Sequence, residues 1–328
     1  MKVIQVGIGG MGNAWLRAVL DSPNVEYAGF VEINDAIAAE QVERYGLDGS
    51  KIFKSLPDAL AAVQADAVIN VTPPQFHKEV SITALEAGLP VLSEKPLADS
   101  FDAALAIVEK ANATGLLHMV GQNRRYMVGP QTLKHALSLP QMGAIGSVAV
   151  EFFRGPHFGG FRDEMPYPLI IDMSIHHFDL MRFFLERDPV NVFGRSWNPP
   201  WSWYKGDASA SLTLEFAGRQ FVSYAASWCS QGREMSWNGE WRFECANGTV
   251  VMRDDDQVYT QMPGQEEVLV EPVQPARLGQ PYLLQEFYEA VVEGKPPVTT
   301  CQDNLKSLAI VFDVIKSFET GQVVKSSA

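Results

Sequence analysis

Three consecutive residues, Glu94-Lys95-Pro96, could supply acid–base chemistry at the end of a short apolar run, Val91-Leu92. Such a run predicts a buried parallel strand, and open α/β sheets hold ligands where these strands end. A lysine at that place can carry a proton, because partial burial and nearby positive charge lower the pKa of an ammonium group. The proline makes a cis Lys95-Pro96 bond possible. Taken alone, the triplet more often marks a strand end with solvated charges.

A second candidate lies in an apolar helical pattern that begins near Ile170. Asp172, His176 and Asp179 recur there at i, i+4 and i+7, so a helix would place them on one face. Asp172 could orient His176 and raise its basicity, as a general base requires. The alternative is a core histidine satisfied by a neighbouring aspartate. A metal site that adds His177 is disfavoured, because His177 points roughly 100° away from His176 around a helix, and no further ligand cluster is visible.

A glycine-rich segment predicts a dinucleotide site near the start of the chain. Residues 7–12 read G-x-G-x-x-G and stand between a strand pattern at 2–6 and a helical pattern at 14–20, the context that gives this motif its meaning. Such glycines permit a tight turn, approach of the backbone to a pyrophosphate, and close helix–strand packing, while free N–H groups at the helix start face the anion. The residues expected to bind the cofactor here are Gly7, Gly9, Gly10, Met11 and Gly12.

Two further positions are expected beside the same cofactor. A second strand ends in Glu32, 20 residues after Gly12, where a carboxylate can accept both ribose hydroxyls of an adenosine and would repel a 2′-phosphate. No arginine follows Glu32 in residues 33–35, so NAD is favoured over NADP. Thr72 and Pro73 end another strand and should lie beside the cofactor. His77 either touches the cofactor or caps its own helix.

The elements around these motifs predict two domains. Strands and helices alternate up to residue 121, which indicates an N-terminal Rossmann domain with a doubly wound parallel sheet. Residues 122–328 predict a C-terminal α/β domain with a large, mostly antiparallel open sheet, one face of which packs on a helix while the other is left to a partner subunit. Helices expected over 282–320 could pack back towards the first domain. The strands expected in the second domain are 147–153, 191–197, 208–216, 220–228, 240–245, 249–252 and 258–262.

Several residues are candidates for contact with a substrate. Arg124 and Tyr126 follow a strand end, although their polar segment could equally be a solvated linker. A run of aromatic residues near Trp201 suits the C–H faces of sugars, but such clusters more often fill cores or interfaces. His177 and Tyr167 complete the set of candidates, because both lie beside the aspartate–histidine pattern.

Composition excludes several classes of function. The net charge is −13 and there is no dense basic run, so nucleic acids and anionic membrane surfaces are unexpected partners. The three cysteines have no CxxC spacing, which favours a reducing compartment, and no apolar run is long enough to span a bilayer. We therefore expect a cytoplasmic protein without a metal site.

With the dinucleotide fingerprint, Thr72-Pro73-Pro74-x-x-His77, Glu94-Lys95-Pro96 and Asp172-x-x-x-His176 in this order, the sequence resembles the Gfo/Idh/MocA oxidoreductase family over essentially its whole length. The resemblance implies a Rossmann domain joined to a C-terminal α/β domain whose open sheet often builds dimers or tetramers. It also implies oxidation or reduction of sugars and polyols with NAD or NADP.

The resemblance further implies roles for single residues. Glu94 would lie near the nicotinamide ribose, Lys95 would hold or protonate the reacting oxygen, and Asp172 and His176 would form the acid–base pair. One segment departs from the family pattern, because a glycine-rich run commonly precedes the aspartate helix and here Met165–Leu169 contains two prolines. The loop should be stiffer and differently shaped, so the substrate class does not transfer.

The expected function is an NAD-dependent dehydrogenase that acts on a secondary alcohol of a sugar, inositol or related polyol. Hydride would pass to the nicotinamide while His176 takes the hydroxyl proton and Lys95 stabilises the alkoxide, although these two roles could be exchanged. Two alternatives remain open. One is a glycosidase that uses transient oxidation by bound NAD, and the other is a regulator that senses sugar and cofactor without chemistry.

Overall fold

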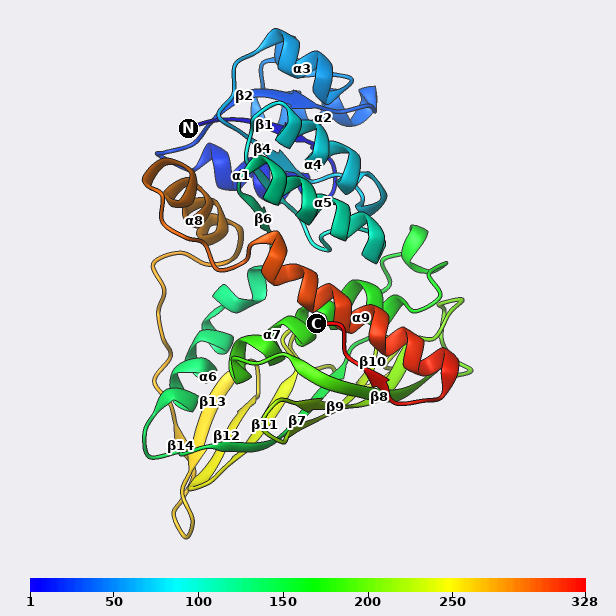
Figure 1. The fold of residues 1–328 in the computed structure, drawn as a ribbon, viewed down its shortest axis with the longest axis vertical. Helices are drawn as coiled ribbons and strands as arrows, with labels where there is room; N and C mark the ends of the chain where they lie inside the picture. The colour runs from blue at the N-terminus through cyan, green and yellow to red at the C-terminus, as the bar shows by residue number, and fades with distance from the viewer. The chain divides into compact units, whose positions relative to one another are not determined.

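The computed structural model describes residues 1–328, which form two compact units (Figure 1). The first unit contains residues 1–123 and 277–305, and the second contains residues 124–276 and 306–328. Each unit is therefore completed by a segment from the last sixth of the chain.

The first unit is built on a six-stranded parallel sheet with the order β3-β2-β1-β4-β5-β6, which confirms the predicted doubly wound sheet. Its strands are β1 (Lys2–Val6), β2 (Glu26–Val31), β3 (Ile52–Phe53), β4 (Ala67–Asn70), β5 (Val91–Ser93) and β6 (His118–Val120). Its helices are α1 (Gly12–Leu20), α2 (Asp35–Tyr45), α3 (Leu56–Ala62), α4 (His77–Glu86), α5 (Phe101–Thr114) and α8 (Gly279–Glu293). Branched apolar residues fill the strands, and all residues of β4 and β5 are buried.

Local sequence explains where these helices begin and end. The Asn34 side chain accepts hydrogen bonds at the start of α2, and the Ser100 hydroxyl accepts one from Ala103 N at the start of α5. Both helices end at a glycine in the left-handed region, Gly46 and Gly115, where a side chain would be strained. Such caps fix the ends of the loops at the sheet edge.

The second unit is built on a nine-stranded sheet with the order β14-β13-β12-β11-β7-β10-β9-β8-β15. Only β7 and β10 pair in parallel, so the predicted mostly antiparallel sheet is confirmed. The strands are β7 (Ile145–Phe153), β8 (Pro189–Trp197), β9 (Ser209–Phe216), β10 (Gln220–Ser227), β11 (Glu240–Cys245), β12 (Gly248–Arg253), β13 (Gln257–Gln261), β14 (Val268–Leu269) and β15 (Val324–Lys325). The two-residue strands β14 and β15 were not predicted, because two residues carry no periodicity.

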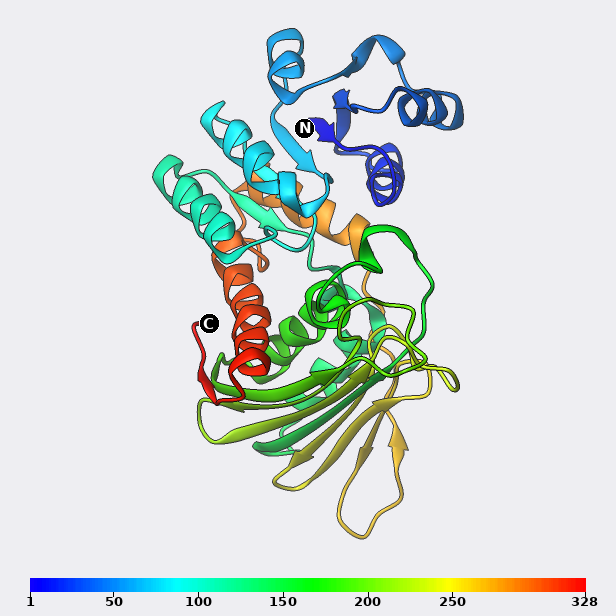
Figure 2. The ribbon, with the colours of Figure 1, turned by 90° about the vertical axis from the view of Figure 1, so that its right-hand side faces the viewer.

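Helices cover one face of this large sheet. They are α6 (Val128–Ser138), α7 (Ile175–Leu185) and the later part of α9 (Cys301–Thr320), and Figure 2 shows the opposite face without a helix. The strands alternate accordingly, since Val148 and Val150 of β7 are buried whereas Ala149 and Glu151 are exposed. The prediction that helices pack one face of an open sheet therefore agrees with the structure.

The helix expected from about Ile170 differs from an ordinary α-helix. Residues Leu169–Ser174 form a π-helix, and the α-helical pattern of α7 begins only at Ile175. The predicted i, i+4, i+7 face for Asp172, His176 and Asp179 is therefore wrong in its first step, because a π-helix bonds i to i+5 and changes the register. The other short helices are 3-10 turns at Gly49–Lys51, Pro74–Phe76, Asn123–Tyr126 and Gly160–Arg162.

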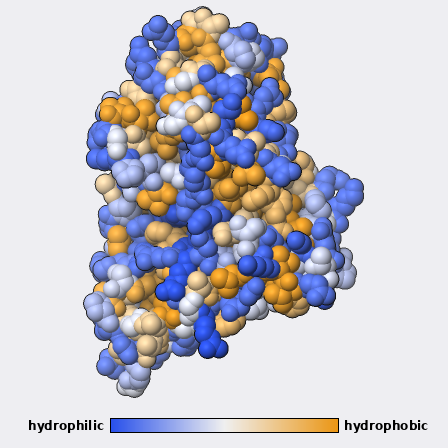
Figure 3. All heavy atoms as spheres, in the orientation of Figure 1, coloured by the Kyte–Doolittle hydropathy of each residue, from blue (hydrophilic) through white to orange (hydrophobic).

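On the surface in view in Figure 3, apolar residues lie in small groups among hydrophilic ones. No helix combines the length and the apolar character needed to cross a membrane.

Candidate functional site

The glycine-rich turn joins β1 to α1, and a neighbouring side chain fixes its conformation. Gly7 has φ +88°, and a Cβ there would lie 2.7 Å from Val71 O, so only glycine fits this turn. The Gln5 side chain donates to Gly7 O and Gly12 O and fixes both ends of the turn. Gly10 and Met11 are exposed at its tip, while Gly9 is half-buried. Exposed backbone N–H groups beside a helix start suit the pyrophosphate of a dinucleotide.

Glu32 lies directly after β2 and is almost fully buried. One carboxylate oxygen accepts from Ile8 N at 3.2 Å, inside the glycine-rich turn, and the other accepts from Asn34 N at 2.9 Å. The predicted ribose-binding carboxylate is therefore fixed against the turn by backbone N–H groups. Lone pairs left on its oxygens suit the ribose hydroxyls.

Glu94 directly follows β5 and is hydrogen-bonded to the helix of the dinucleotide turn. Trp15 of α1 donates its indole N–H to Glu94 Oε1 at 2.7 Å, and Lys95 N donates to Oε2 at 3.1 Å. Burial raises the pKa of Glu94 above its ordinary value, although the indole donor opposes the shift. Sequence analysis missed Trp15, and the signal was available: a buried indole N–H requires an acceptor.

The Lys95-Pro96 bond is cis, and the turn that contains it is linked to the neighbouring strand end through His77. The buried imidazole contacts Pro96 O through Nδ1 at 2.8 Å and Thr72 O through Nε2 at 2.7 Å. A neutral ring donates only once, and burial lowers the pKa of His77, so one of these contacts is a hydrogen bond. His77 thus connects two predicted cofactor loops from the first turn of α4.

Asn70 organises the loop that carries Thr72 and Pro73. Its side-chain oxygen accepts from Thr72 N and from Thr72 Oγ1, and its backbone oxygen accepts from Glu94 N. This buried amide was not among the predicted site residues. It places the ends of β4 and β5 side by side, so the first unit gathers Thr72, Glu94 and Lys95 at one edge of its sheet, where the glycine-rich turn also lies.

In the second unit, Asp172 lies in the π-helix and accepts a hydrogen bond from Arg162 Nε at 2.6 Å. The guanidinium of Arg162 also lies over the rings of Phe158 and Phe161, at 5.2 and 4.7 Å from their centroids. Arg162 was missed, because nothing in its local sequence distinguishes it from a solvated arginine. Single π turns recur at functional sites.

The two histidines of α7 have different surroundings. His176 keeps 6% of its surface exposed, whereas His177 has none. His177 Nδ1 lies 2.9 Å from the Tyr224 hydroxyl, which also contacts Ser174 Oγ at 2.8 Å. Burial, reinforced by nearby Arg124, lowers the pKa of His177 to about 3. His177 is thus a neutral, buried side chain with a hydroxyl partner, which argues against its predicted contact with a substrate.

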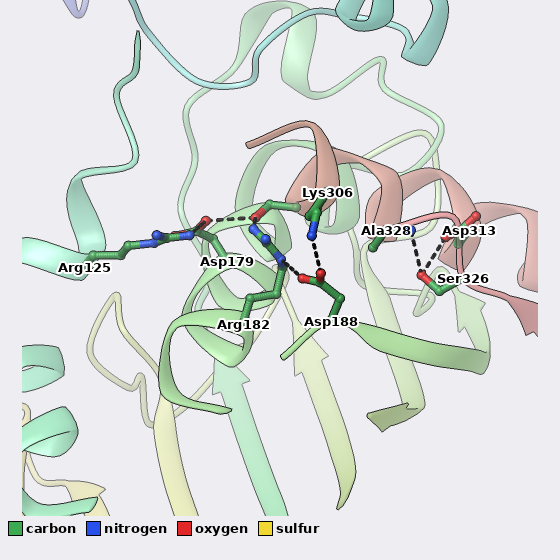
Figure 4. Close-up of polar contacts among 9 residues, drawn as sticks. Arg125, Asp179, Arg182, Asp188, Lys306, Asp313, Ser326 and Ala328 are labelled. Carbon is green, nitrogen blue, oxygen red and sulfur yellow. Dashed lines mark hydrogen bonds and ion pairs between the residues drawn. The ribbon is translucent and has the colours of Figure 1, made fainter. Parts of the chain in front are cut away.

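A buried ion-pair network joins α7 to neighbouring segments of the second unit (Figure 4). Arg125 donates to both carboxylate oxygens of Asp179 at 2.6 Å, and Ser307 Oγ donates to one of them at 2.8 Å. Arg182 extends the network to Ser307 and Asp188. Asp179, the third residue of the predicted stripe, therefore has a structural partner.

The remaining predicted substrate residues are dispersed over the second unit. Tyr126 is buried, and the Tyr167 ring lies against Phe318 with centroids 5.8 Å apart. Trp201 is 61% exposed and donates its indole N–H to Cys229 O. In the same aromatic segment Tyr204 is buried and stacks on Trp228, so the segment serves partly as core.

Arg124 has a polar environment at the start of the second unit. Its guanidinium donates to Asn238 Oδ1 at 3.2 Å and lies 5.9 Å from the Trp237 ring centroid. Burial lowers the pKa of Arg124 to about 10; the charge of Asp256 opposes this shift, and the charge of Arg154 makes a smaller contribution in the same direction as burial. As regards metals, the structure contains no group of three or more His, Cys, Asp or Glu side chains that could hold an ion.

Comparisons with known proteins identify related families for both halves of the chain. Residues 1–122 match the oxidoreductase family with an NAD-binding Rossmann fold, and residues 143–326 match its C-terminal alpha/beta domain. The uncharacterized protein y4oX of Sinorhizobium fredii is 31% identical over 99% of this chain and 95% of its own length. The scyllo-inositol 2-dehydrogenase (NAD(+)) of Bacillus subtilis is 28% identical over 98% of this chain and 94% of its own length.

Solved structures share the same fold. An oxidoreductase from Agrobacterium radiobacter, in complex with NAD+, L-tartaric acid and magnesium, superimposes with a TM-score of 0.91 at 19% identity, covering 99% of this chain and 98% of that one. At this identity the likeness concerns the fold. Together with the two family matches, these findings show that the chain belongs to the Gfo/Idh/MocA oxidoreductase family and is an NAD-dependent oxidoreductase.

Proposed function

We propose that this protein oxidises a secondary alcohol of a sugar, inositol or related polyol with NAD. The observation that carries the proposal is the hydrogen bond from Trp15 to Glu94, which ties the Glu94–Lys95 turn to the helix of the dinucleotide turn. Lys95 thus has its backbone fixed at the sheet edge where NAD binds. The scyllo-inositol dehydrogenase of Bacillus subtilis supports a polyol as substrate.

In the proposed mechanism the alcohol loses one hydride and one proton. NAD, when bound, supplies the acceptor for the hydride that leaves the carbinol carbon. His176 takes the hydroxyl proton as general base, and Lys95 donates a hydrogen bond to the oxygen as negative charge develops on it. Arg162 orients Asp172 through an ion pair, and Asp172 in turn stabilises the imidazolium of His176.

Two substitutions test these roles. Lys95→Met and His176→Ala should each lower kcat for polyol oxidation at least 100-fold, the usual contribution of a positioned acid or base. Lys78→Met and His135→Ala remove the same groups from exposed positions and should leave kcat unchanged. Production of NADH is followed by absorbance over a panel of inositols and sugars, and NAD affinity by calorimetry.

The outcomes separate the proposal from its alternatives. Turnover that persists in both Lys95→Met and His176→Ala would contradict the assigned chemistry. Release of free sugar from a glycoside without net NADH would indicate a glycosidase that oxidises its substrate transiently. Tight binding of NAD without turnover on the whole panel would indicate a sensor.

The open face of the nine-stranded sheet supports an assembly proposal. Phe193 and Phe221 project from strands whose alternate residues are buried, and they are 38% and 46% exposed. We propose that a second copy of the chain covers this face, since apolar side chains on a flat sheet are commonly buried in subunit contacts. A monomeric mass by light scattering would contradict it. The division of labour between a cofactor domain and a substrate domain, and the cytoplasmic location, stay predictions.

A further inference from the structure

Two adjacent arginines, Arg124 and Arg125, differ in how their charge is neutralised. Arg125 is 4% exposed and forms two 2.6 Å hydrogen bonds with the carboxylate of Asp179. Arg124 donates instead to a neutral amide oxygen, that of Asn238, and no carboxylate lies within ion-pair distance of it. A largely buried guanidinium that makes no direct ion pair is unfavourable, because a carboxylate that acts only from beyond ion-pair distance offsets little of the cost of desolvating the cation.

The surroundings of Arg124 contain charges of both signs, because Asp256 attracts its guanidinium and Arg154 repels it. Arg154 lies over the same indole, Trp237, with its guanidinium carbon 4.3 Å from the ring centroid. Arg154 is paired with Glu234 at 2.8 Å, although its Nε is buried without a partner. Asp256 accepts hydrogen bonds from Ser236 and Asn238. Its negative charge therefore acts on Arg124 through Asn238 and without a direct hydrogen bond to the guanidinium.

Asn238 orients the guanidinium of Arg124. The Asn238 side chain is 3% exposed and donates its Nδ2–H to Asp256, so its Oδ1 faces Arg124. An amide oxygen orients a guanidinium without cancelling its charge, whereas a carboxylate would do both. The arrangement leaves the remaining N–H groups of Arg124 available to an incoming acceptor.

The position is close to the proposed base. Arg124 lies near enough to His177 to lower its pKa, and His177 follows His176 in the first turn of α7. A Cβ added at Gly239, beside Asn238, would lie 3.7 Å from His177 Nε2. The Arg124–Asn238 pair and the start of α7 are therefore neighbours within the second unit.

We propose that Arg124 binds a carboxylate of the substrate, so that the protein acts on acidic sugars or polyols, such as hexuronates and aldonates. This inference rests on the proposed function and narrows its substrate class. A planar guanidinium matches a carboxylate through two parallel hydrogen bonds. Asn238 and Trp237 position the guanidinium, and Arg124 alone touches the substrate.

The test compares matched pairs of substrates that differ in the acidic group. NADH production is measured for D-glucuronate against D-glucose and for D-gluconate against D-sorbitol, with D-glucose 6-phosphate as the phosphate arm. The wild type should favour the acidic member of each pair at least 10-fold in kcat/KM. Arg124→Gln should reduce this ratio at least 10-fold, mainly through KM, and Arg124→Lys should retain part of it. Arg242→Gln, which removes an exposed arginine, should leave the ratio unchanged.

The possible results distinguish failure of this inference from failure of the proposed function. Equal use of acidic and neutral members by the wild type, or a ratio unaffected by Arg124→Gln, overturns this inference and leaves the proposed function intact. Preference for the phosphate arm overturns it as well. If no compound on the panel yields NADH, the proposed function fails. In that case calorimetric binding of D-glucuronate to the NAD-loaded protein decides, because binding that is lost in Arg124→Gln supports the carboxylate site and absence of binding refutes it.

Discussion

The two units position their proposed catalytic groups by different means. In the first unit, the Glu94–Lys95 turn is held by uncharged groups, the indole of Trp15 and the imidazole of His77. In the second unit, α7 and the preceding π turn are held by arginine–carboxylate ion pairs, Arg162 with Asp172 and Arg125 with Asp179.

These two kinds of contact, neutral hydrogen bonds and buried ion pairs, differ in how well they tolerate substitution of one partner. A buried ion pair needs both charges, and removal of one partner leaves the other uncompensated. A hydrogen bond from an indole needs no charge on the donor, and its loss leaves one unsatisfied acceptor. Substitutions should therefore be more damaging in the second unit than in the first, where burial raises the pKa of the Glu94 carboxyl.

The largest effect is expected for Asp179→Asn. This substitution leaves Arg125 buried without a counter-charge, so the free energy of unfolding should fall by about 3–5 kcal/mol, measured by urea denaturation. Lys205→Gln breaks a pair in which both side chains are well exposed and should change it by less than about 1 kcal/mol. Equal losses in the two variants would remove the distinction between buried and exposed pairs.

A smaller effect is expected for Trp15→Phe. The ring volume is largely kept, but Glu94 Oε1 loses its donor, so unfolding free energy should fall by about 1–3 kcal/mol. The value of kcat should fall as well, because the turn that carries Lys95 loses its tie to α1. Trp201→Phe, which removes an indole N–H from a largely exposed ring, is the matched control. A loss no larger than that of the control would show that Trp15 does not hold the turn.

The smallest effect concerns pH. Burial raises the pKa of Glu94 above 4.5, its ordinary value, so the folded protein holds this proton more tightly than the unfolded chain. The contribution of Glu94 to stability is therefore fully present below pH 4.5 and is lost as pH rises through the raised pKa. Glu94→Gln does not titrate, so its stability relative to wild type should increase over that range. A relative stability that is constant with pH would contradict the raised pKa.

The parts of the site that sequence predicted are those encoded by consecutive residues. The glycine-rich turn, Glu32 at the end of its strand and the Glu94–Lys95 turn depend on local patterns, and the parallel sheet follows from βα alternation. The hydrogen bond from Trp15 to Glu94 joins residues 79 positions apart. The Arg162–Asp172 pair depends on how the loop that contains Arg162 folds against the π-helix. Such contacts are set by tertiary packing, which no local pattern specifies.

The π turn shows a second limit of sequence analysis. Propensity and apolar spacing favour helix over Leu169–Leu185, and they do not distinguish i+4 from i+5 bonding within one turn. Likewise, Arg124 and Arg125 are the same residue type at adjacent positions. Their opposite environments arise from Asn238 and Asp179, which lie far along the chain.

The return of the chain to the first unit has a consequence for biosynthesis. Val120 of the edge strand β6 donates to Thr299 O, α8 packs against α1, and Asn24, in the loop after α1, donates a hydrogen bond to Gln285 of α8. A ribosome that has released only residues 1–123 has therefore delivered a nucleotide-binding fold whose last strand and first helix still lack their covering. The N-terminal half is therefore expected to reach its final packing only after residues 277–305 have been translated, and to expose the uncovered surfaces of β6 and α1 until then.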